Sequence, residues 1–250
     1  INVNKEINLK KYAKKVYSQN DEDGIIHAIF TIIGAKKKYY VEFGTEDGSE
    51  TNTRNLFENF GWKGLLMDGG NEYDYINLKK EFITKENILH LFSKYKVPTT
   101  FDLLSIDIDG NDIHIWIELM SKYKPRVVII EYAPAFGYDY DKVPEYKKDY
   151  VWNRRNQLFG IGYSGSSIEV LRKVGNMLGY DLVYANVVNL FFIKKTIITK
   201  NKYNFKNIND SKKLYNAVNK KYLAKIKKLK ININNILDRK HILFDDFINT

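Results

Sequence analysis

The sequence contains no cysteine and no long apolar stretch. The absence of cysteine excludes disulfides, thiol catalysis and zinc sites built from thiolates, and it fits a reducing compartment. No run approaches the roughly 18 consecutive apolar residues of a membrane helix, and the opening segment INVNKEINLKKYAKK lacks the apolar core of a signal peptide. We therefore expect a cytoplasmic protein that does not enter a membrane. The chain also lacks an initiating Met, which indicates a trimmed chain or one domain of a longer protein.

The composition is that of a chain with a sizeable core and a basic extension. Its 250 residues are 44% hydrophobic and 14% aromatic, which is enough to bury one domain. The net charge is +10, yet residues 200–250 hold 13 Lys and Arg against 4 Asp and Glu, so residues 1–199 are nearly neutral. The charge therefore belongs to the extension and not to the main domain. We predict a catalytic domain over residues 1–199 and a basic, largely helical extension over residues 200–250.

Within the extension, apolar residues recur at spacings of three and four, which is typical of an amphipathic helix. They are Tyr215, Val218, Tyr222, Ile226, Leu229, Ile233 and Ile236. One interpretation is a helix that docks on the main domain or on a second subunit, so that a homo-oligomer would form through it. The other is a basic arm that contacts nucleic acid or an anionic surface.

Residues 38–195 alternate between short apolar runs and segments with helical spacing. The runs 38–44, 64–68, 101–108 and 126–132 predict strands, and the segments 51–59, 86–95 and 112–123 predict helices. This alternation is typical of parallel strands joined by right-handed helical crossovers, with helices on both faces of the sheet. The capping box Ser166-Ser167-Ile168-Glu169 predicts one more helix, ending near Leu178 before Gly179.

Two further runs, 181–186 and 190–195, are separated by only three residues. That connection is too short for a parallel crossover, so it predicts an antiparallel hairpin at one edge of the sheet. The complete pattern predicts an α/β protein with the class I methyltransferase (Rossmann-like) fold. Its sheet would be doubly wound and mostly parallel, with a C-terminal antiparallel hairpin.

Each of the four parallel strands is followed by acidic residues. They are Glu42 with the loop GTEDG, Asp68 with Gly69, the stretch SIDIDGND (105–112), and Glu131. The carboxyl ends of parallel strands meet at one edge of a sheet, where ligands bind at the point of strand-order reversal. Unpaired carboxylates at buried strand ends are costly. We therefore predict one shared ligand site.

The first loop discriminates between cofactors. A dinucleotide site requires GxGxxG, whereas GTEDG would place Glu46 and Asp47 near the pyrophosphate and repel it. S-adenosylmethionine has no phosphate and carries a sulfonium cation, so an acidic loop suits it. Asp68 can accept both ribose hydroxyls, a role that an acid at this place also has in NAD enzymes.

Six segments resemble the FkbM-type S-adenosylmethionine-dependent methyltransferases. They are YSQNDEDGIIHAIFTIIG (17–34), YYVEFGTEDGSETNTRNL (39–56), GWKGLLMDG (61–69), FDLLSIDIDGNDIHIW (101–116), PRVVIIEY (125–132) and YSGSSIEVLRKVGNMLGYDLVYANVVNLFFI (163–193). The resemblance implies O-methyl transfer, often to a sugar hydroxyl, and hence glycan modification. It implies cofactor contacts at Glu42, Gly44, Asp68 and Asp107, and our predicted cofactor-binding set also includes Gln19, Thr45, Asp47 and Gly69. Residues beyond about 197 have no recognised counterpart.

Methyl transfer to a hydroxyl needs a base or a metal ion that acidifies the hydroxyl. Asp107 and Asp109 would alternate on one face of their strand, and Glu131 ends the neighbouring strand. Three such carboxylates could hold Mg²⁺ or Mn²⁺. Alternatively the cofactor occupies Asp107, and residues 109–112 form a turn that caps the next helix. Our catalytic candidates are Asp109, Asp107 and His114, although His114 would otherwise face solvent or pack beside Trp116.

The acceptor is expected against the aromatic and polar segment 137–165, where Asn153, Arg154 and Arg155 could bond hydroxyls or phosphate. The alternative for this segment is an ordinary surface loop. We predict an O-methyltransferase for a sugar, glycan or related small molecule, and we expect no membrane or nucleic-acid partner. Two other hypotheses are a non-catalytic module that binds S-adenosylmethionine and an RNA methyltransferase that uses the basic extension.

Overall fold

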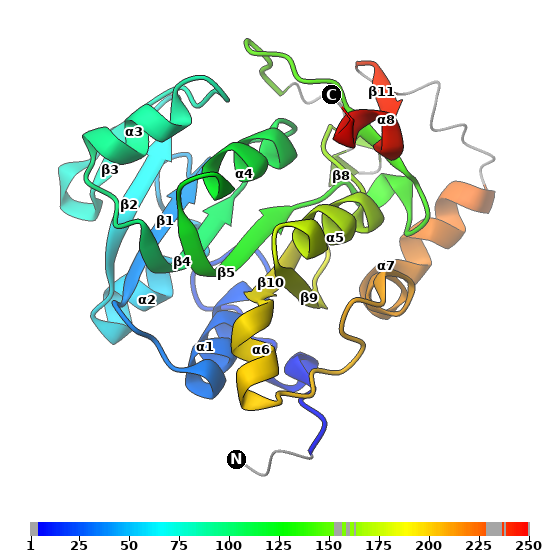
Figure 1. Ribbon diagram of the computed structural model, residues 1–250, viewed down its shortest axis with the longest axis horizontal. Coiled ribbons are helices and arrows are strands. Elements are labelled where there is room, and N and C mark those ends of the chain that lie inside the picture. The colour runs from blue at the N-terminus through cyan, green and yellow to red at the C-terminus, as the bar shows by residue number, and fades with distance from the viewer. Residues whose placement is uncertain are drawn as a thin grey trace.

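A seven-stranded sheet with helices on both faces forms the centre of the computed structural model (Figure 1). The structure describes residues 5–152, 157–158, 161–162, 164–228, 237 and 239–249. The strands lie in the order β3 (Leu78–Lys80), β2 (Lys63–Asp68), β1 (Tyr39–Phe43), β4 (Thr100–Ile106), β5 (Lys124–Glu131), β10 (Asn189–Lys194) and β9 (Tyr180–Ala185). The strands β3, β2, β1, β4 and β5 are parallel, and β10 pairs antiparallel with both β5 and β9.

This strand order is that of the class I methyltransferase fold, so the predicted fold class is confirmed. The order reverses between β1 and β4, since the chain builds outwards from β1 to β3 and then returns to the other side of β1. A reversal of this kind opens a crevice at the carboxyl ends of the two strands. The hairpin of β9 and β10 closes the other side of the sheet, as predicted.

Both faces of the sheet are buried, because alternate residues of each strand point into different cores. On one face Val41 and Phe43 pack with α3 (Ile88–Lys94), α4 (Asp112–Met120) and α5 (Ile168–Met177). On the other face Tyr40 and Leu66 pack with α1 (Glu22–Ile33), α2 (Arg54–Phe60) and α6 (Lys195–Asn201). Each fully buried side chain of this size contributes about 1.5–3 kcal/mol. These two cores fix the strand ends that carry the acidic residues.

Two local predictions need correction. The strand predicted over 101–108 ends at Ile106, so Asp107 and Asp109 lie in the connection that follows β4. The capping box predicted from Ser166 is wrong, because α5 is capped by Ser167, whose Oγ accepts a hydrogen bond from the Val170 backbone N–H at 3.2 Å. Glu169 instead forms an ion pair with Arg172.

The C-terminal extension packs against the main domain. Helix α7 (Ser211–Lys228) contacts α5, β9 and the 3-10 helix η3 (Pro134–Phe136). The hydroxyl of the buried Tyr215 donates to the Pro134 carbonyl at 2.6 Å, and Asn219 donates to the Tyr132 hydroxyl at 2.5 Å. Strand β11 (His241–Leu243) pairs antiparallel with β6 (Lys142–Pro144) and leads into α8 (Phe244–Ile248).

Part of the predicted apolar helix face falls outside what the structure describes. Leu229, Ile233 and Ile236 lie outside the described residues, and so do the side chains of Tyr222 and Ile226. Oligomerisation through this helix stays a prediction. Among the described helices, none has the length and apolar character that a membrane crossing requires.

Candidate active site

A cavity of about 580 Å³ opens at the carboxyl ends of β1, β2, β4 and β5, where the strand order reverses. All eight predicted cofactor-binding residues line it, as do Asp109 and Glu131. Nine of its lining residues are acidic, namely Glu42, Glu46, Asp47, Glu50, Asp68, Glu81, Asp107, Asp109 and Glu131. Among the described lining residues there is no Lys or Arg. The predicted convergence of four strand ends on one site is therefore present.

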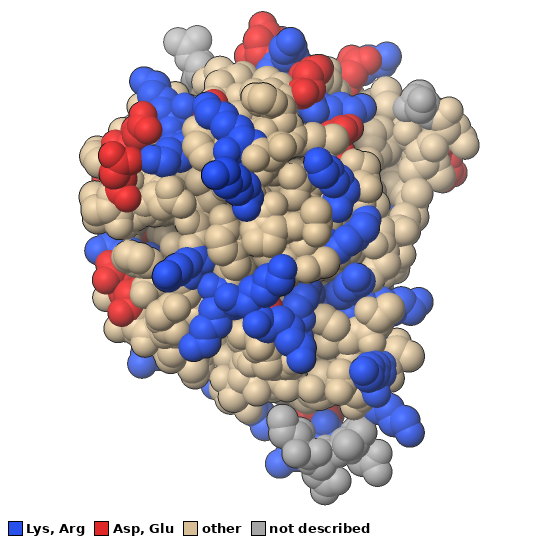
Figure 2. All heavy atoms as spheres, turned by 60° about the vertical axis from the view of Figure 1, so that its left-hand side comes forward, with Lys and Arg blue, Asp and Glu red and all other residues tan. Residues whose placement is uncertain are grey.

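The opposite edge of the sheet, where the parallel strands begin, is basic. Exposed lysines precede or start β1, β2, β4 and β5, namely Lys36, Lys37, Lys38, Lys63, Lys96, Lys122 and Lys124. Figure 2 shows Lys and Arg side chains gathered across the middle of one face, with Asp and Glu mainly at its margins. Positive charge therefore gathers where the parallel strands begin, at the edge opposite the acidic cavity.

Gly44 brings the ends of β1 and β4 into direct contact. Its φ is +67°, and a Cβ added at this position would lie 1.5 Å from the carbonyl oxygen of Asp107. Its backbone N–H donates to the Met67 carbonyl at 3.0 Å, which also ties the loop to β2. Only glycine combines this backbone conformation with such a close approach. The glycine therefore sets the floor of the cavity.

Glu42 anchors the loop that follows β1. Its Oε1 accepts the Asn52 backbone N–H at 2.8 Å, while its Oε2 accepts the backbone N–H of Thr53 at 2.9 Å and the Thr53 hydroxyl at 2.5 Å. Burial raises the pKa of this carboxyl to about 7, although the three hydrogen bonds oppose the shift. The carboxylate thus holds the start of α2. Direct contact of Glu42 with a cofactor stays a prediction.

Asp68 ends β2 and fixes two loops at the cavity rim. Its Oδ2 accepts the Glu46 backbone N–H at 3.0 Å, and its Oδ1 accepts the Gly70 backbone N–H at 2.7 Å. Each carboxylate oxygen has a further lone pair. Asp68 therefore has the position and the free acceptor capacity that recognition of a ribose diol would require.

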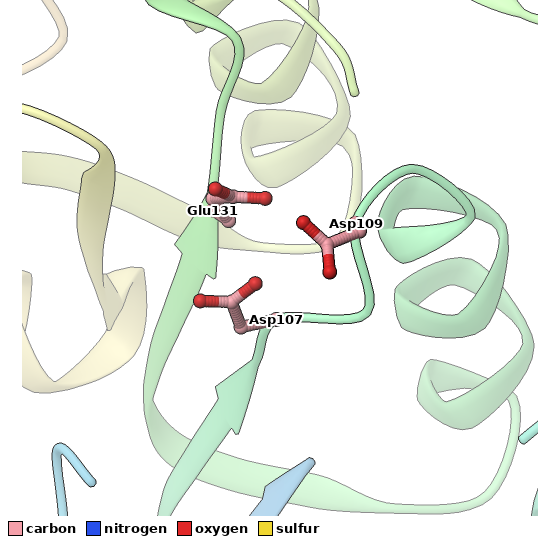
Figure 3. A group of neighbouring side chains, drawn as sticks. All are labelled: Asp107, Asp109 and Glu131. Atoms are coloured by element: carbon pink, nitrogen blue, oxygen red, sulfur yellow. The ribbon is translucent and has the colours of Figure 1, made fainter. Parts of the chain in front are cut away.

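Three carboxylates from neighbouring strand ends face one another (Figure 3). Oxygen atoms of Asp107, Asp109 and Glu131 lie within 4.8 Å of one another. Asp107 directly follows β4, Glu131 is the last residue of β5, and Asp109 lies in the turn after β4 with a φ of +59°. The turn, and not strand alternation as predicted, brings Asp109 to the other two. Left-handed backbone at a residue other than glycine is strained and is common at functional sites.

The pKa values of these three carboxyl groups are raised. Burial and the nearby charges of Asp109 and Asp112 raise the pKa of Asp107 well above its usual value. Burial and the nearby charges of Asp107 and Asp109 raise the pKa of Glu131 well above its usual value. Burial raises the pKa of Asp109 to about 7. Three convergent oxygen donors suit Mg²⁺ or Mn²⁺, so the residues fit the predicted metal site.

Asp112 serves the backbone and does not join this group. Its side chain is buried and accepts the backbone N–H of Ile108 at 2.8 Å and of Gly110 at 2.6 Å. It thereby closes the turn that carries Asp109 and begins α4. Asp112 therefore closes the turn, whereas Asp107 and Asp109 line the cavity. The N-cap residue Asn111 makes no side-chain capping hydrogen bond among the described residues, so the alternative of a turn whose acids cap the next helix is not realised.

His114 does not line the cavity. It is buried on α4, with its Nε2 at 2.8 Å from the Pro144 carbonyl and its ring 5.4 Å from that of Tyr146 and 5.5 Å from that of Phe247. Burial lowers its pKa to about 4. The catalytic role predicted for His114 is not supported by this position. The ring, which is carried by α4, packs against the end of β6, Tyr146 and α8.

Several lining residues were not singled out from the sequence. Asn52, Asn111, Val188 and Asn189 lie on the cavity wall. The Nδ2 of Asn189 donates to Glu22 at 3.0 Å, while its buried Oδ1 has no hydrogen-bond partner among the described residues. The buried Thr45 hydroxyl also has no hydrogen-bond partner among the described residues. No local pattern identifies Asn189, because the fold alone brings the hairpin to the cavity.

The predicted aromatic cover of the cavity is described only in part. Tyr150 and Trp152 line the cavity, in agreement with a role for the segment 137–165. Asn153, Arg154 and Arg155, the predicted hydroxyl- or phosphate-binding residues, lie outside the described residues.

No protein-family model and no curated protein matches this chain. Among solved structures, the chain is similar to a structure described as a SAM-dependent methyltransferase from Aquifex aeolicus, with a TM-score of 0.36 and 11% sequence identity. The match covers 74% of this chain and 94% of the other. A similarity at this level carries no argument, so the fold assignment rests on the strand order alone. Membership of the FkbM-type family stays a prediction.

Proposed function

We propose that this cavity binds S-adenosylmethionine and that the protein transfers its methyl group to an acceptor hydroxyl. The observation that carries the proposal is a strongly acidic cavity at the strand-order reversal of a class I methyltransferase fold, with no Lys or Arg among its described lining residues. Such a cavity favours a cationic ligand without phosphate. A dinucleotide is disfavoured because its pyrophosphate would face Glu46 and Asp47.

The cofactor would lie across the ends of β1 and β2. Asp68 would accept the ribose hydroxyls, and the loop from Gly44 to Asp47 would pass beneath the amino-acid part. The buried Thr45 hydroxyl, which has no partner among the described residues, offers a hydrogen bond to that part. Gln19 and Gly69 also line the cavity. The carboxylates of Asp107 and Glu131 would face the positively charged sulfonium.

Asp109 is our candidate for the general base. Its pKa of about 7 leaves it partly ionised at neutral pH, where it can take a proton. In the proposed step the acceptor oxygen attacks the methyl carbon, the bond from that carbon to sulfur breaks, and S-adenosylhomocysteine leaves as a neutral thioether. The hydroxyl proton moves to the Asp109 carboxylate.

Divalent-metal assistance is the alternative to a general base at Asp109. Asp107, Asp109 and Glu131 would hold Mg²⁺ or Mn²⁺ through carboxylate oxygens. A bound ion of this kind lowers the pKa of a nearby hydroxyl. Its positive charge would also offset the burial and the nearby negative charges that raise the pKa of these side chains.

A sugar or glycan is the acceptor class that we favour. Tyr150 and Trp152 line the cavity, and aromatic faces of this kind stack on sugar rings. An RNA acceptor is disfavoured, because its phosphates would be repelled by the nine carboxylates of the wall.

The decisive experiment is calorimetric titration with S-adenosylhomocysteine, with and without Mg²⁺ or Mn²⁺. We expect binding that falls at least about tenfold in Asp68→Ala, because both ribose hydrogen bonds are lost. Asp141→Ala, which removes an acid that pairs with Lys173 outside the cavity, is the control and should bind like wild type. Absence of heat under all conditions would overturn the proposal. Binding without transfer of a labelled methyl group to any sugar acceptor would favour a non-catalytic module.

A further inference from the structure

Arg239, in the C-terminal extension, joins three segments beside the cavity. Its guanidinium donates to the carbonyl of Ser164 at 2.8 Å and to that of Glu145 at 3.3 Å. It also donates to the Gly110 carbonyl, and to the Asn111 Oδ1 at 2.9 Å. These acceptors belong to the turn after β4, to the segment after β6 and to the residues before α5. One side chain therefore ties together parts of the chain that are far apart in sequence.

Two of the groups that Arg239 holds are themselves parts of the cavity wall. Asn111 lines the cavity, and so does Tyr150, whose ring centroid lies 4.3 Å from the Arg239 Cζ. Gly110 directly follows Asp109, whose left-handed backbone places its carboxylate opposite Asp107 and Glu131. A strained conformation of this kind persists only when its surroundings hold it. The guanidinium is part of those surroundings.

The turn is shaped to admit this side chain. Gly110 has a φ of +143°, and a Cβ added to it would lie 2.6 Å from the Arg239 Nη2. The backbone on the other side is held by strand pairing, since β11 pairs with β6 and the Glu145 N–H donates to the Lys240 carbonyl at 2.8 Å. The position of Arg239 is therefore set by main-chain hydrogen bonds. The Asn111 side chain adds a second link by donating to the Lys147 carbonyl at 2.9 Å.

We propose that Arg239 is a positioning residue for the cavity, which holds the turn that carries Asp109 and the wall that carries Tyr150. Only arginine has a planar fork of donors that can serve several carbonyl groups while one face stacks on an aromatic ring. By this inference the extension, which the sequence marks mainly by its charge, completes the acidic end of the cavity. The identity of the bound ligand rests on the proposed function, whereas the positioning role does not.

The test compares Arg239→Ala and Arg239→Lys with Lys240→Ala in the full chain. Lys240 is the matched control, because it is adjacent and, among the described residues, its side chain makes only a 3.7 Å ion pair with Glu145. Amide hydrogen exchange should become faster in residues 107–112 and 142–152 of Arg239→Ala and stay unchanged in residues 39–48 and 63–68. Lysine should not restore the slow exchange, since one ammonium cannot replace the fork and the stacking.

Ligand binding distinguishes a positioning role from a general loss of stability. Only a positioning role would weaken the binding of Mn²⁺ more than that of S-adenosylhomocysteine. Mn²⁺ binding, followed by electron paramagnetic resonance, should weaken about tenfold in Arg239→Ala, as for other residues that orient metal ligands. Affinity for S-adenosylhomocysteine should change less than about threefold, because the ends of β1 and β2 are untouched. Lys240→Ala should match wild type in both.

Two outcomes are distinct. If Arg239→Ala shows wild-type exchange in residues 107–112 and 142–152, or faster exchange spread evenly over the chain, the positioning role is overturned. If wild type binds neither S-adenosylhomocysteine nor Mn²⁺, the proposed function fails, and the exchange comparison alone still decides the role of Arg239.

Discussion

Asp102 and Asp107 lie five positions apart, one within β4 and one directly after it, yet their surroundings are opposite. Asp102 is fully buried and accepts backbone N–H groups of Lys36, Lys37 and Lys38 at 2.6–3.1 Å. It also forms a 2.7 Å ion pair with Arg126. These partners lower its pKa although burial opposes the shift.

Asp107 is also desolvated, but acids surround it. Burial and the charges of Asp109, Asp112 and Glu42 raise its pKa well above the usual value. Burial alone therefore does not mark a functional carboxylate. A carboxylate with N–H and guanidinium partners stabilises the fold, whereas one held among other carboxylates lacks a partner that a cationic ligand can supply.

The largest expected effect comes from the paired carboxylate. Asp102→Ala should lower the free energy of unfolding by about 3–5 kcal/mol, because it leaves Arg126 and several backbone N–H groups without their acceptor. Urea denaturation at pH 7 measures the change. Asp141→Ala removes a half-buried ion pair with Lys173 and should cost about 1 kcal/mol. A loss below that of this control would contradict the structural role of Asp102.

A second prediction separates the effect of the close contact at Gly44 from the effect of its left-handed backbone. Gly44→Ala should cost about 3 kcal/mol and abolish ligand binding, because the new Cβ would overlap the Asp107 carbonyl and push β1 from β4. Gly61→Ala is the matched control, with a φ of +65° and a ψ of 31° in the left-handed region, and no atom of the described residues within 4 Å of the added Cβ. It should cost only about 1 kcal/mol. Equal losses in urea denaturation would show that the contact is unimportant.

Asp107→Asn should change the free energy of unfolding in the opposite direction to Asp102→Ala. Removing one charge from the acidic group should raise the free energy of unfolding at pH 8 by about 1 kcal/mol, while binding of S-adenosylhomocysteine or Mn²⁺ is lost. Denaturation and calorimetry on the same preparation measure both. A destabilised variant that still binds its ligands would reverse our assignment of the two aspartates.

The last prediction is a pH dependence of stability. Asp109 and Glu42 have pKa values of about 7 in the folded protein, against 3.8 and 4.5 without its influence. Between pH 5 and pH 7 the folded state therefore holds protons that the unfolded state has lost, so the free energy of unfolding should fall as the pH rises, by about 2 kcal/mol for each of the two groups. Asp102 acts in the opposite direction, and only below about pH 4, since its folded pKa is lowered.

Asp109→Asn tests this assignment. The variant should lose part of the decrease between pH 5 and pH 8 in urea denaturation, and Mg²⁺ or Mn²⁺ should stabilise wild type more at pH 8 than at pH 6. An unchanged pH profile would show that Asp109 does not titrate in this range.

The sequence by itself determined the fold class and the existence of the acidic site. Apolar runs of strand length, helical spacing between them and a connection too short for a crossover are local features, and parallel strands necessarily bring their carboxyl ends to one edge. Glu42, Asp68, Asp107 and Glu131 could therefore be placed together without coordinates. Their convergence on one cavity follows from strand direction alone.

Only the tertiary structure decided which polar groups satisfy one another. The left-handed turn at Asp109, the burial of His114 against Pro144 and the arrival of Asn189 at the cavity depend on contacts between distant segments. Arg239 reaches a turn that is 128 positions away from it in the sequence. Spacing along the chain reports which face of an element is apolar, but a hydrogen bond between remote segments leaves no periodic signal. For this reason the acidic residues of the site could be predicted from the sequence, whereas the residues that position them could not.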